Sequence, residues 1–182
     1  MKINNTTVEV VHDSMMHQKV EAVVNAANSD LADGGGITGL IFKTAGSGLP
    51  AEIKLKYPRG TPTGTAVITG GHKLRQPYII HTPGPYWRGG NSGEPGLLAS
   101  SYRSCLQVAD KAGLKSIAFC SISTGIYLYP LDQAAPLALK TVRDYLKAHP
   151  ETTLERVVFA MFMPDEFAAF MKASAEMDGE TV

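Results

Sequence analysis

Cysteine is scarce in this sequence, and its scarcity excludes two common ways of stabilising a fold. Cys105 and Cys120 are the only cysteines among the 182 residues, and they form no C-x-x-C pair. The five histidines show no zinc-ligand spacing such as H-E-x-x-H. We therefore expect two buried thiols in a reducing compartment, with no disulfide and no structural metal.

Long apolar runs and an excess of charge of one sign are also missing. No segment approaches the roughly 18 apolar residues of a membrane span, and the polar N-terminus lacks the apolar core of a signal peptide. A cytoplasmic protein without membrane contact is the expectation. Lys+Arg and Asp+Glu each number 17, so the net charge is zero and nucleic acid is not an expected partner. A small anion remains compatible with zero net charge, because backbone N–H groups can bind it.

The sequence does contain an alternation of strand-like and helix-like segments. With 182 residues, 44% of them hydrophobic, it predicts one domain over residues 1–177 and a polar tail over 178–182. This alternation predicts a three-layer α/β/α sandwich. The expected strands are 7–11, 21–24, 65–69, 78–82, 115–121 and 156–161. The expected helices are 37–45, 49–56, 97–112, 131–149 and 165–177.

Two strand–loop–helix units carry the residues suited to ligand binding. In the first, a strand leads through Asn25-Ala26-Ala27-Asn28 to the glycine-rich residues 33–39; in the second, a strand leads to Ser121-Ile122-Ser123-Thr124-Gly125-Ile126-Tyr127. Open α/β sheets bind ligands beyond the carboxyl ends of their strands. Glycines let a backbone approach an anion closely. Two such loops side by side suit a diphosphate.

The first loop also fits G-x-G-x-x-G, as Gly34, Gly36 and Gly39. This pattern leaves an NAD(P)-dependent oxidoreductase as a remote alternative. In a Rossmann unit the glycines follow the strand directly, whereas roughly ten residues intervene here. The acidic residue near the expected distance, Glu52, lies in a helical segment rather than at a strand end.

Taken together, these motifs resemble those of the macrodomain family, which binds ADP-ribose. The two loops resemble its ligand loops, and residues 62–66, 80–85 and 87–90 resemble their counterparts in bacterial O-acetyl-ADP-ribose deacetylases. The resemblance extends from about Val8 to Met171. It implies a cleft for ADP-ribose above a mixed, roughly six-stranded central sheet.

The resemblance also assigns roles to individual residues. Asp13, followed by Ser14, matches the aspartate that accepts a hydrogen bond from the adenine amino group, and Phe162 matches the aromatic residue beside adenine. Asn28 matches the asparagine that contacts the distal ribose, and Asn25 is expected to tie down its loop. The other expected ligand contacts, mainly through backbone N–H groups, are Gly34, Gly35, Gly36, Ile37, Ser123, Thr124, Gly125, Ile126 and Tyr127.

The sequence departs from the deacetylase pattern at Thr38. This residue stands where the motif has an aspartate thought to activate or orient the attacking water. A threonine hydroxyl can orient water but cannot act as a base near neutral pH. We therefore expect Thr38 to face the distal ribose and to orient water at most. Asp33, which replaces the first of four loop glycines, is interpreted as a solvated loop residue.

The sequence therefore predicts an ADP-ribose-binding macrodomain with esterase chemistry. The expected reaction is hydrolysis of ester-linked ADP-ribose, on mono-ADP-ribosylated protein carboxylates or in O-acetyl-ADP-ribose. Asn28 and Thr38 are the candidate catalytic residues, and no cofactor is expected. The alternative is a non-catalytic ADP-ribose reader, because Thr38 replaces the usual aspartate.

Overall fold

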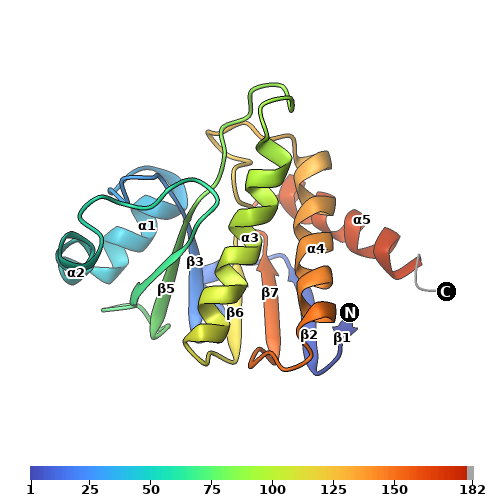
Figure 1. The fold of residues 1–182 in the computed structure, drawn as a ribbon, viewed down its shortest axis with the longest axis horizontal. Coiled ribbons are helices and arrows are strands. Elements are labelled where there is room, and N and C mark those ends of the chain that lie inside the picture. The colour runs from blue at the N-terminus through green and yellow to red at the C-terminus, as the bar shows by residue number, and fades with distance from the viewer. Residues whose placement is uncertain (180–182) are drawn as a thin grey trace.

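A seven-stranded mixed sheet forms the middle layer of the protein (Figure 1). The computed structural model describes residues 1–179 and confirms the predicted α/β/α sandwich. The strands are β1 Lys2–Ile3, β2 Thr6–Val11, β3 Ala22–Ala27, β4 Val67–Gly70, β5 Tyr78–Pro83, β6 Ser116–Phe119 and β7 Arg156–Ala160. The α-helices are α1 Gly36–Ala45, α2 Gly48–Lys56, α3 Glu94–Lys111, α4 Leu131–Ala148 and α5 Pro164–Gly179, and a 3-10 turn spans Met15–His17.

The strand order is β1-β2-β7-β6-β3-β5-β4, in which the five inner strands are parallel. The edge strands β1 and β4 each pair antiparallel with their neighbours. The sheet has one strand more than the roughly six expected, because β1 is only two residues long and leaves no periodic pattern in the sequence. Strand β4 begins after Thr65 rather than at it. The amide and the hydroxyl of Thr65 both donate hydrogen bonds to the Pro62 carbonyl, so this residue belongs to a turn.

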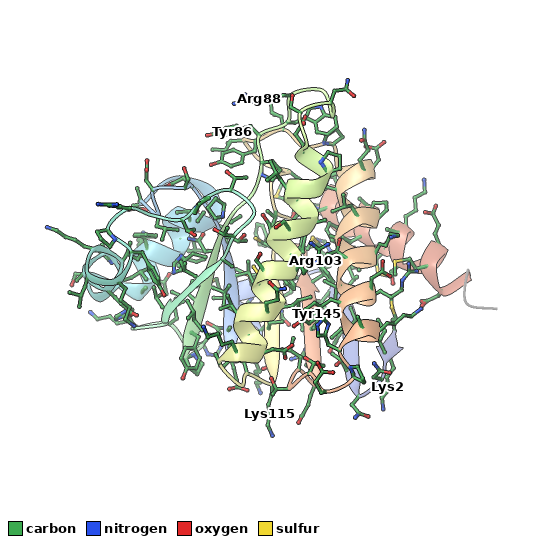
Figure 2. All side chains as sticks on the ribbon, in the orientation of Figure 1. Lys2, Tyr86, Arg88, Arg103, Lys115 and Tyr145 are labelled. Carbon is green, nitrogen blue, oxygen red and sulfur yellow. The ribbon has the colours of Figure 1, made fainter. Side chains whose placement is uncertain are left out.

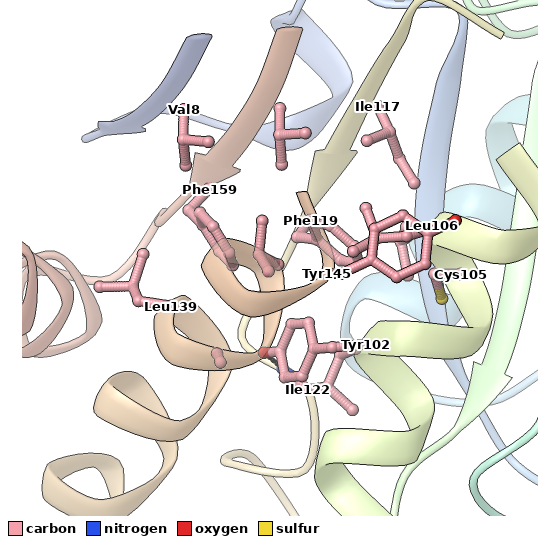
Figure 3. Close-up of a cluster of buried hydrophobic side chains, with 14 of the residues drawn as sticks. Val8, Tyr102, Cys105, Leu106, Ile117, Phe119, Ile122, Leu139, Tyr145 and Phe159 are labelled. Carbon is pink, nitrogen blue, oxygen red and sulfur yellow. Dashed lines mark hydrogen bonds between the residues drawn. The ribbon is translucent and has the colours of Figure 1, made fainter. Parts of the chain in front are cut away.

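Two apolar cores cover the two faces of the sheet. Helices α3, α4 and α5 pack on one face, and α1 and α2 pack on the other. Figure 3 shows the first core, where the Tyr102 and Phe119 rings lie 5.1 Å apart and the Phe119 and Phe159 rings 5.4 Å apart. Burying each such ring contributes about 1.5–3 kcal/mol to folding. Tyr102 also accepts a hydrogen bond from the Ile122 amide at 3.1 Å, so this core anchors the loop after β6.

Helix α3 begins at Glu94, three residues earlier than predicted, and the glutamate organises the loop before it. The side chain is 2% exposed and accepts hydrogen bonds from the amides of Arg88, Gly90 and Ser92 at 3.0, 2.7 and 2.6 Å. Burial raises the pKa of this carboxyl, but the hydrogen bonds outweigh burial and hold the pKa below its usual value. The long loop between β5 and α3 is therefore an ordered structure.

Helix α5 runs to Gly179 and so includes the first two residues of the predicted tail; residues 180–182 lie outside the described residues. The boundary of the domain stays a prediction. Within residues 1–179, no helix is both long enough and apolar enough to cross a membrane. The cytoplasmic localisation remains a prediction as well.

Candidate functional site

A cavity of ≈ 730 Å³ lies at the carboxyl ends of β3, β5, β6 and β7. Adjacent strands β3 and β6 lead to helices on opposite faces of the sheet, α1 and α4, so their loops diverge and leave a crevice. Most of the predicted site residues line it: Ser14, Asn28, Gly34, Gly35, Gly36, Ile37, Thr38, Ser123, Gly125, Ile126, Tyr127 and Phe162.

Three predicted site residues lie outside the cavity lining: Asp13, Asn25 and Thr124. The Asp13 carboxylate accepts hydrogen bonds from the Ser14 amide and the Gln18 side chain and pairs with His17. Thr124 donates to Ser121 Oγ at 2.6 Å and so shapes its own loop. Asn25 is buried, and its side-chain amide lies within hydrogen-bond distance of Thr38 and His81.

The first loop presents the beginning of helix α1 to the cavity. Gly35 caps this helix without a side-chain hydrogen bond, and Gly36 has a φ of 58°, which favours glycine. The first amides of a helix have no partner within it, and the helix dipole makes them attractive to an anion. Gly35 and Gly36 are exposed, and a Cβ at either would meet nothing within 4 Å. The amides therefore face space that a ligand can enter.

The second loop offers a matching set of donors. Among residues 1–179, the amides of Gly125, Ile126 and Tyr127 have no hydrogen-bond acceptor. Ser123 is in the left-handed region at φ 67°, and its hydroxyl is buried without a partner in the described structure. An unsatisfied buried hydroxyl costs about 1–3 kcal/mol, so its position suits a polar ligand.

Gly84, the residue directly after β5, leaves room for Ser123 and Ile122 of the second loop. A Cβ on Gly84 would lie 2.1 Å from Ser123 Oγ and 2.6 Å from Ile122 Cγ2. Gly84 also lines the cavity. A residue outside the two predicted loops therefore determines how closely the second loop can approach the cavity.

Thr38 belongs to a buried chain of hydrogen bonds that runs beneath the first loop. Its hydroxyl lies 3.0 Å from Asn25 Oδ1 and 3.0 Å from the Ala26 carbonyl. Asn25 Nδ2 lies 3.1 Å from His81 Nδ1, and His81 Nε2 lies 2.9 Å from Thr69 Oγ1. Because the Asn25 amide donates, His81 Nδ1 is the unprotonated nitrogen and Nε2 carries the proton.

These hydrogen bonds constrain the role that the sequence suggested for Thr38. The residue lines the cavity, but its single hydroxyl proton is directed to Asn25 and Ala26 rather than to the open space. Its oxygen can still accept a hydrogen bond. Burial lowers the pKa of His81 to about 4, so the imidazole is neutral at neutral pH.

Asn28 closes the first loop while facing the cavity. Its Nδ2 donates to the Ala32 carbonyl at 2.9 Å, and its Oδ1 accepts from the Ala32 amide at 3.0 Å. A side-chain amide has two donor hydrogens and two lone pairs, so one of each remains free. The neighbouring Ser29 and Asp30 are exposed and lie outside the cavity lining.

Three aromatic side chains line the cavity: Phe162, Tyr86 and Tyr127. Phe162 follows β7 and is 68% exposed, far more than a core residue. The Tyr86 and Tyr127 rings stack with centroids 3.7 Å apart. Figure 2 shows Tyr86 at the end of the molecule where β6 and β7 finish, opposite Lys2 and Lys115. Flat apolar surfaces of this kind suit a base or a sugar.

The sequence did not identify several other lining residues, among them Met15, Gly84, Tyr86, Cys120 and Glu166. The unusual length of the loop after β5 was a usable signal for Gly84 and Tyr86. No signal marked Glu166, since an acidic residue in the first turn of a helix is common. Cys120 is half-buried rather than buried, and burial raises its pKa to about 12, so the thiol is not ionised.

The charges around the cavity are unusual for an anion site. No lysine or arginine lines it, and Glu166 is its one acidic residue within the described part of the chain. Residues 1–179 also contain no group of three or more His, Cys, Asp or Glu side chains that could hold a metal ion. An anion in this cavity would therefore be held by peptide dipoles.

Comparison with known proteins gives one consistent result. The family model of the Macro domain matches residues 24–138. The chain is 42% identical to a macro domain-containing protein of Caldanaerobacter subterraneus over 94% of this chain and 97% of that protein.

Solved structures agree with the sequence matches. The fold is similar to a macrodomain of Oceanobacillus iheyensis with ADP (TM-score 0.91, 33% identity, 99% of this chain and 96% of that chain). It is also similar to a Trypanosoma brucei macrodomain in complex with ADP-ribose (TM-score 0.84, 36% identity, 92% of this chain and 68% of that chain).

Proposed function

This chain belongs to the macro domain family, and on that premise we propose that it binds ADP-ribose in the cavity at the carboxyl ends of β3, β5, β6 and β7. One observation carries the proposal. Two sets of unpartnered amides, from the start of α1 and from the loop after β6, converge on a cavity without basic side chains. That arrangement suits a diphosphate, because amides and a helix N-terminus stabilise anions without charged side chains.

We assign the two ends of the ligand by their surroundings. The adenine base lies against Phe162, and the distal ribose lies towards Asn28 and the stacked Tyr86–Tyr127 pair. The buried, unpartnered hydroxyl of Ser123 supports a polar ligand group between these ends. ADP and ADP-ribose accompany the related solved structures named above, which supports the same ligand class.

Ligand binding is expected to stabilise the fold selectively. At 100 times its dissociation constant, ADP-ribose should raise the free energy of unfolding by about 2.7 kcal/mol. A thermal-shift series with ADP-ribose, NAD and AMP measures this. The largest shift is expected for ADP-ribose, since AMP lacks the second phosphate and the distal ribose. A larger shift with NAD would favour the oxidoreductase alternative instead.

Substituting Gly84 tests whether the second loop must settle into the cavity. Gly84→Ala should weaken ADP-ribose binding about tenfold, equivalent to roughly one hydrogen bond, because the new Cβ displaces Ser123 and Ile122. Calorimetric titration measures the affinity. Gly96→Ala is the matched control, since a Cβ at this exposed position in α3 meets nothing within 4 Å. Equal affinities in both variants would show that the loop position is unimportant.

For the finer activity we propose hydrolysis of an ester at the distal ribose. The reaction consumes one water and releases ADP-ribose and the acid, either a protein carboxylate or acetate. Asn28 would position the ribose through its free amide hydrogen and lone pair. The exposed residues beside Asn28 support a protein-linked substrate, because the acceptor protein can extend into solvent there.

A non-catalytic ADP-ribose reader is the second candidate, and a specific observation favours it. No carboxylate lines the ribose end of the cavity within residues 1–179: Asp33 lies outside the lining and accepts from the Gly34 amide at 2.7 Å. The Thr38 proton is already directed to Asn25 and Ala26. Without a general base, which typically contributes 10²–10⁴-fold, turnover would depend on water held by the ligand and the loop amides.

A further inference from the structure

A turn over residues 57–61 contacts the first loop at the residue that follows Asn28. The Thr61 amide donates a hydrogen bond to the Ser29 carbonyl at 2.9 Å. The turn is itself held on the sheet, because the Tyr57 hydroxyl donates to a carbonyl of β4 at 2.7 Å. None of residues 57–61 lines the cavity, so the turn can influence a ligand only through the loop that it supports.

Gly60 determines how closely this turn approaches the first loop. Its φ is 66°, in the left-handed region that favours glycine. A Cβ at this position would overlap the Ser29 carbonyl oxygen, and it would lie 2.9 Å from the carbonyl carbon of Ser29 and 3.0 Å from Asp30 Cα. These are backbone atoms, so no rotation of a side chain can relieve the contact. Any side chain at position 60 therefore moves the first loop and the turn apart.

Residues 28–32 of the first loop form a unit that transmits such a movement to Asn28. The Asn28 side chain is bonded to both the amide and the carbonyl of Ala32, and the Leu31 amide donates to the Asn28 carbonyl at 3.0 Å. Leu31 is 2% exposed and fixes one side of the unit in the core. The turn fixes the other side through the Ser29 carbonyl, so losing that contact would tilt Asn28 relative to the cavity.

The amides proposed to hold the diphosphate are fixed separately. At the start of α1, the Thr38 hydroxyl donates to the Ala26 carbonyl of β3 at 3.0 Å. The second loop is anchored by Tyr102, whose hydroxyl accepts from the Ile122 amide at 3.1 Å. Neither anchor involves the turn. A movement of residues 28–32 is therefore expected to disturb the ribose end of the site and to leave the diphosphate amides in place.

We propose that Gly60 is a positioning residue for the distal ribose. It lets the turn hold the Ser29 carbonyl, which sets the position of Asn28 and thereby how strongly the distal ribose contributes to binding. This inference rests on the proposed binding of ADP-ribose and deepens it. ADP carries the same adenosine and diphosphate but lacks the distal ribose, so only ADP-ribose uses Asn28. The difference in affinity between the two ligands therefore reports the position of Asn28.

Calorimetric titration of Gly60→Ala with ADP-ribose and with ADP tests this inference. Affinity for ADP-ribose should fall about fivefold, equivalent to roughly one hydrogen bond, whereas affinity for ADP should change less than about twofold. Gly113→Ala is the matched control: its φ of 69° imposes the same backbone strain, but a Cβ there meets nothing within 4 Å. The control variant should bind both ligands as the wild type does.

A second change tests whether Gly60 acts through Asn28. In an Asn28→Ala background, Gly60→Ala should lower ADP-ribose affinity no further, because the contact that it displaces is already gone. If Gly60→Ala yields too little folded protein, Tyr57→Phe replaces it, since this change adds no atom and removes only the hydroxyl bond to β4. Tyr57→Phe should lower ADP-ribose affinity about twofold without an effect on ADP, and an unchanged affinity would then overturn the inference.

The outcomes separate this inference from the function on which it rests. If the wild type binds neither ligand, or ADP alone, the proposed function itself is wrong. If it binds ADP-ribose but Gly60→Ala lowers both affinities equally or changes neither, the turn has only a structural role and the inference is overturned. An undiminished effect in the Asn28→Ala background, or an equal effect in Gly113→Ala, overturns it as well. A loss confined to ADP-ribose and absent in that background supports the inference.

Discussion

Replacing Asn28 with alanine is expected to slow the release of ADP-ribose from a carboxylate-modified protein by about 100-fold. Loss of one positioning contact at a reacting group commonly has an effect of this size. The Asn28 side chain faces the cavity and retains one free donor hydrogen and one free lone pair after closing its loop on Ala32. The measurement is a single-turnover assay with protein in excess of the dissociation constant, which separates chemistry from binding.

Two further measurements decide how this result is interpreted. Ser29→Ala, a change at the next, exposed residue, should leave the release rate unchanged. ADP-ribose affinity of Asn28→Ala should change much less than the rate, since the loop amides hold the diphosphate. If wild type binds ADP-ribose but releases none from the modified protein, the site is a reader, and the catalytic assignment of Asn28 fails.

The fold is expected to lose about 3 kcal/mol of unfolding free energy between pH 6.5 and pH 4 through His81 alone. Burial lowers the pKa of this imidazole from 6.5 to about 4 in the folded chain. The unfolded chain therefore binds the proton first, and stability falls as the pH drops through this window. Protonation at Nδ1 would also remove the acceptor of the Asn25 amide and break the chain of hydrogen bonds to Thr38.

Denaturant unfolding at several pH values between 4 and 7 measures the effect. His81→Asn should be less stable at neutral pH but should show a flatter dependence on pH, because the titrating group is gone. His149→Gln, a change at the end of α4 and outside this network, should retain the wild-type dependence. An unchanged slope in His81→Asn would assign the acid sensitivity to other groups.

The sequence predicted the layers of the fold well, and both loops proposed to bind the ligand line the cavity, because layers and loops alike depend on local patterns. Apolar runs such as residues 115–121 mark buried strands, and the clustered glycines mark a loop with special backbone geometry. The predictions were incomplete where the decisive contact joins distant segments. Glu166, for example, enters the cavity from α5, and Gly84 supports Ser123 from a loop far earlier in the chain.

Thr38 illustrates the same limit at the level of one hydrogen bond. Its place at the start of α1 was predictable, and so was its inability to act as a base. The direction of its proton was not, because that depends on Asn25 being held in turn by His81 from β5. The sequence predicted about six strands, and the structure has a seventh, β1. The two residues of β1 form a strand because they pair with β2, not because of any preference of their own.

The pairing at the margins of the sheet has a consequence for association between molecules. A long, flat outermost strand presents unpaired backbone groups that can recruit another chain and begin aggregation. Here the outermost strands are β1, with two residues, and β4, with four, and both run against the direction of their neighbours. The five parallel strands that carry the ligand loops lie between these two short strands, which themselves offer little backbone for pairing with another chain.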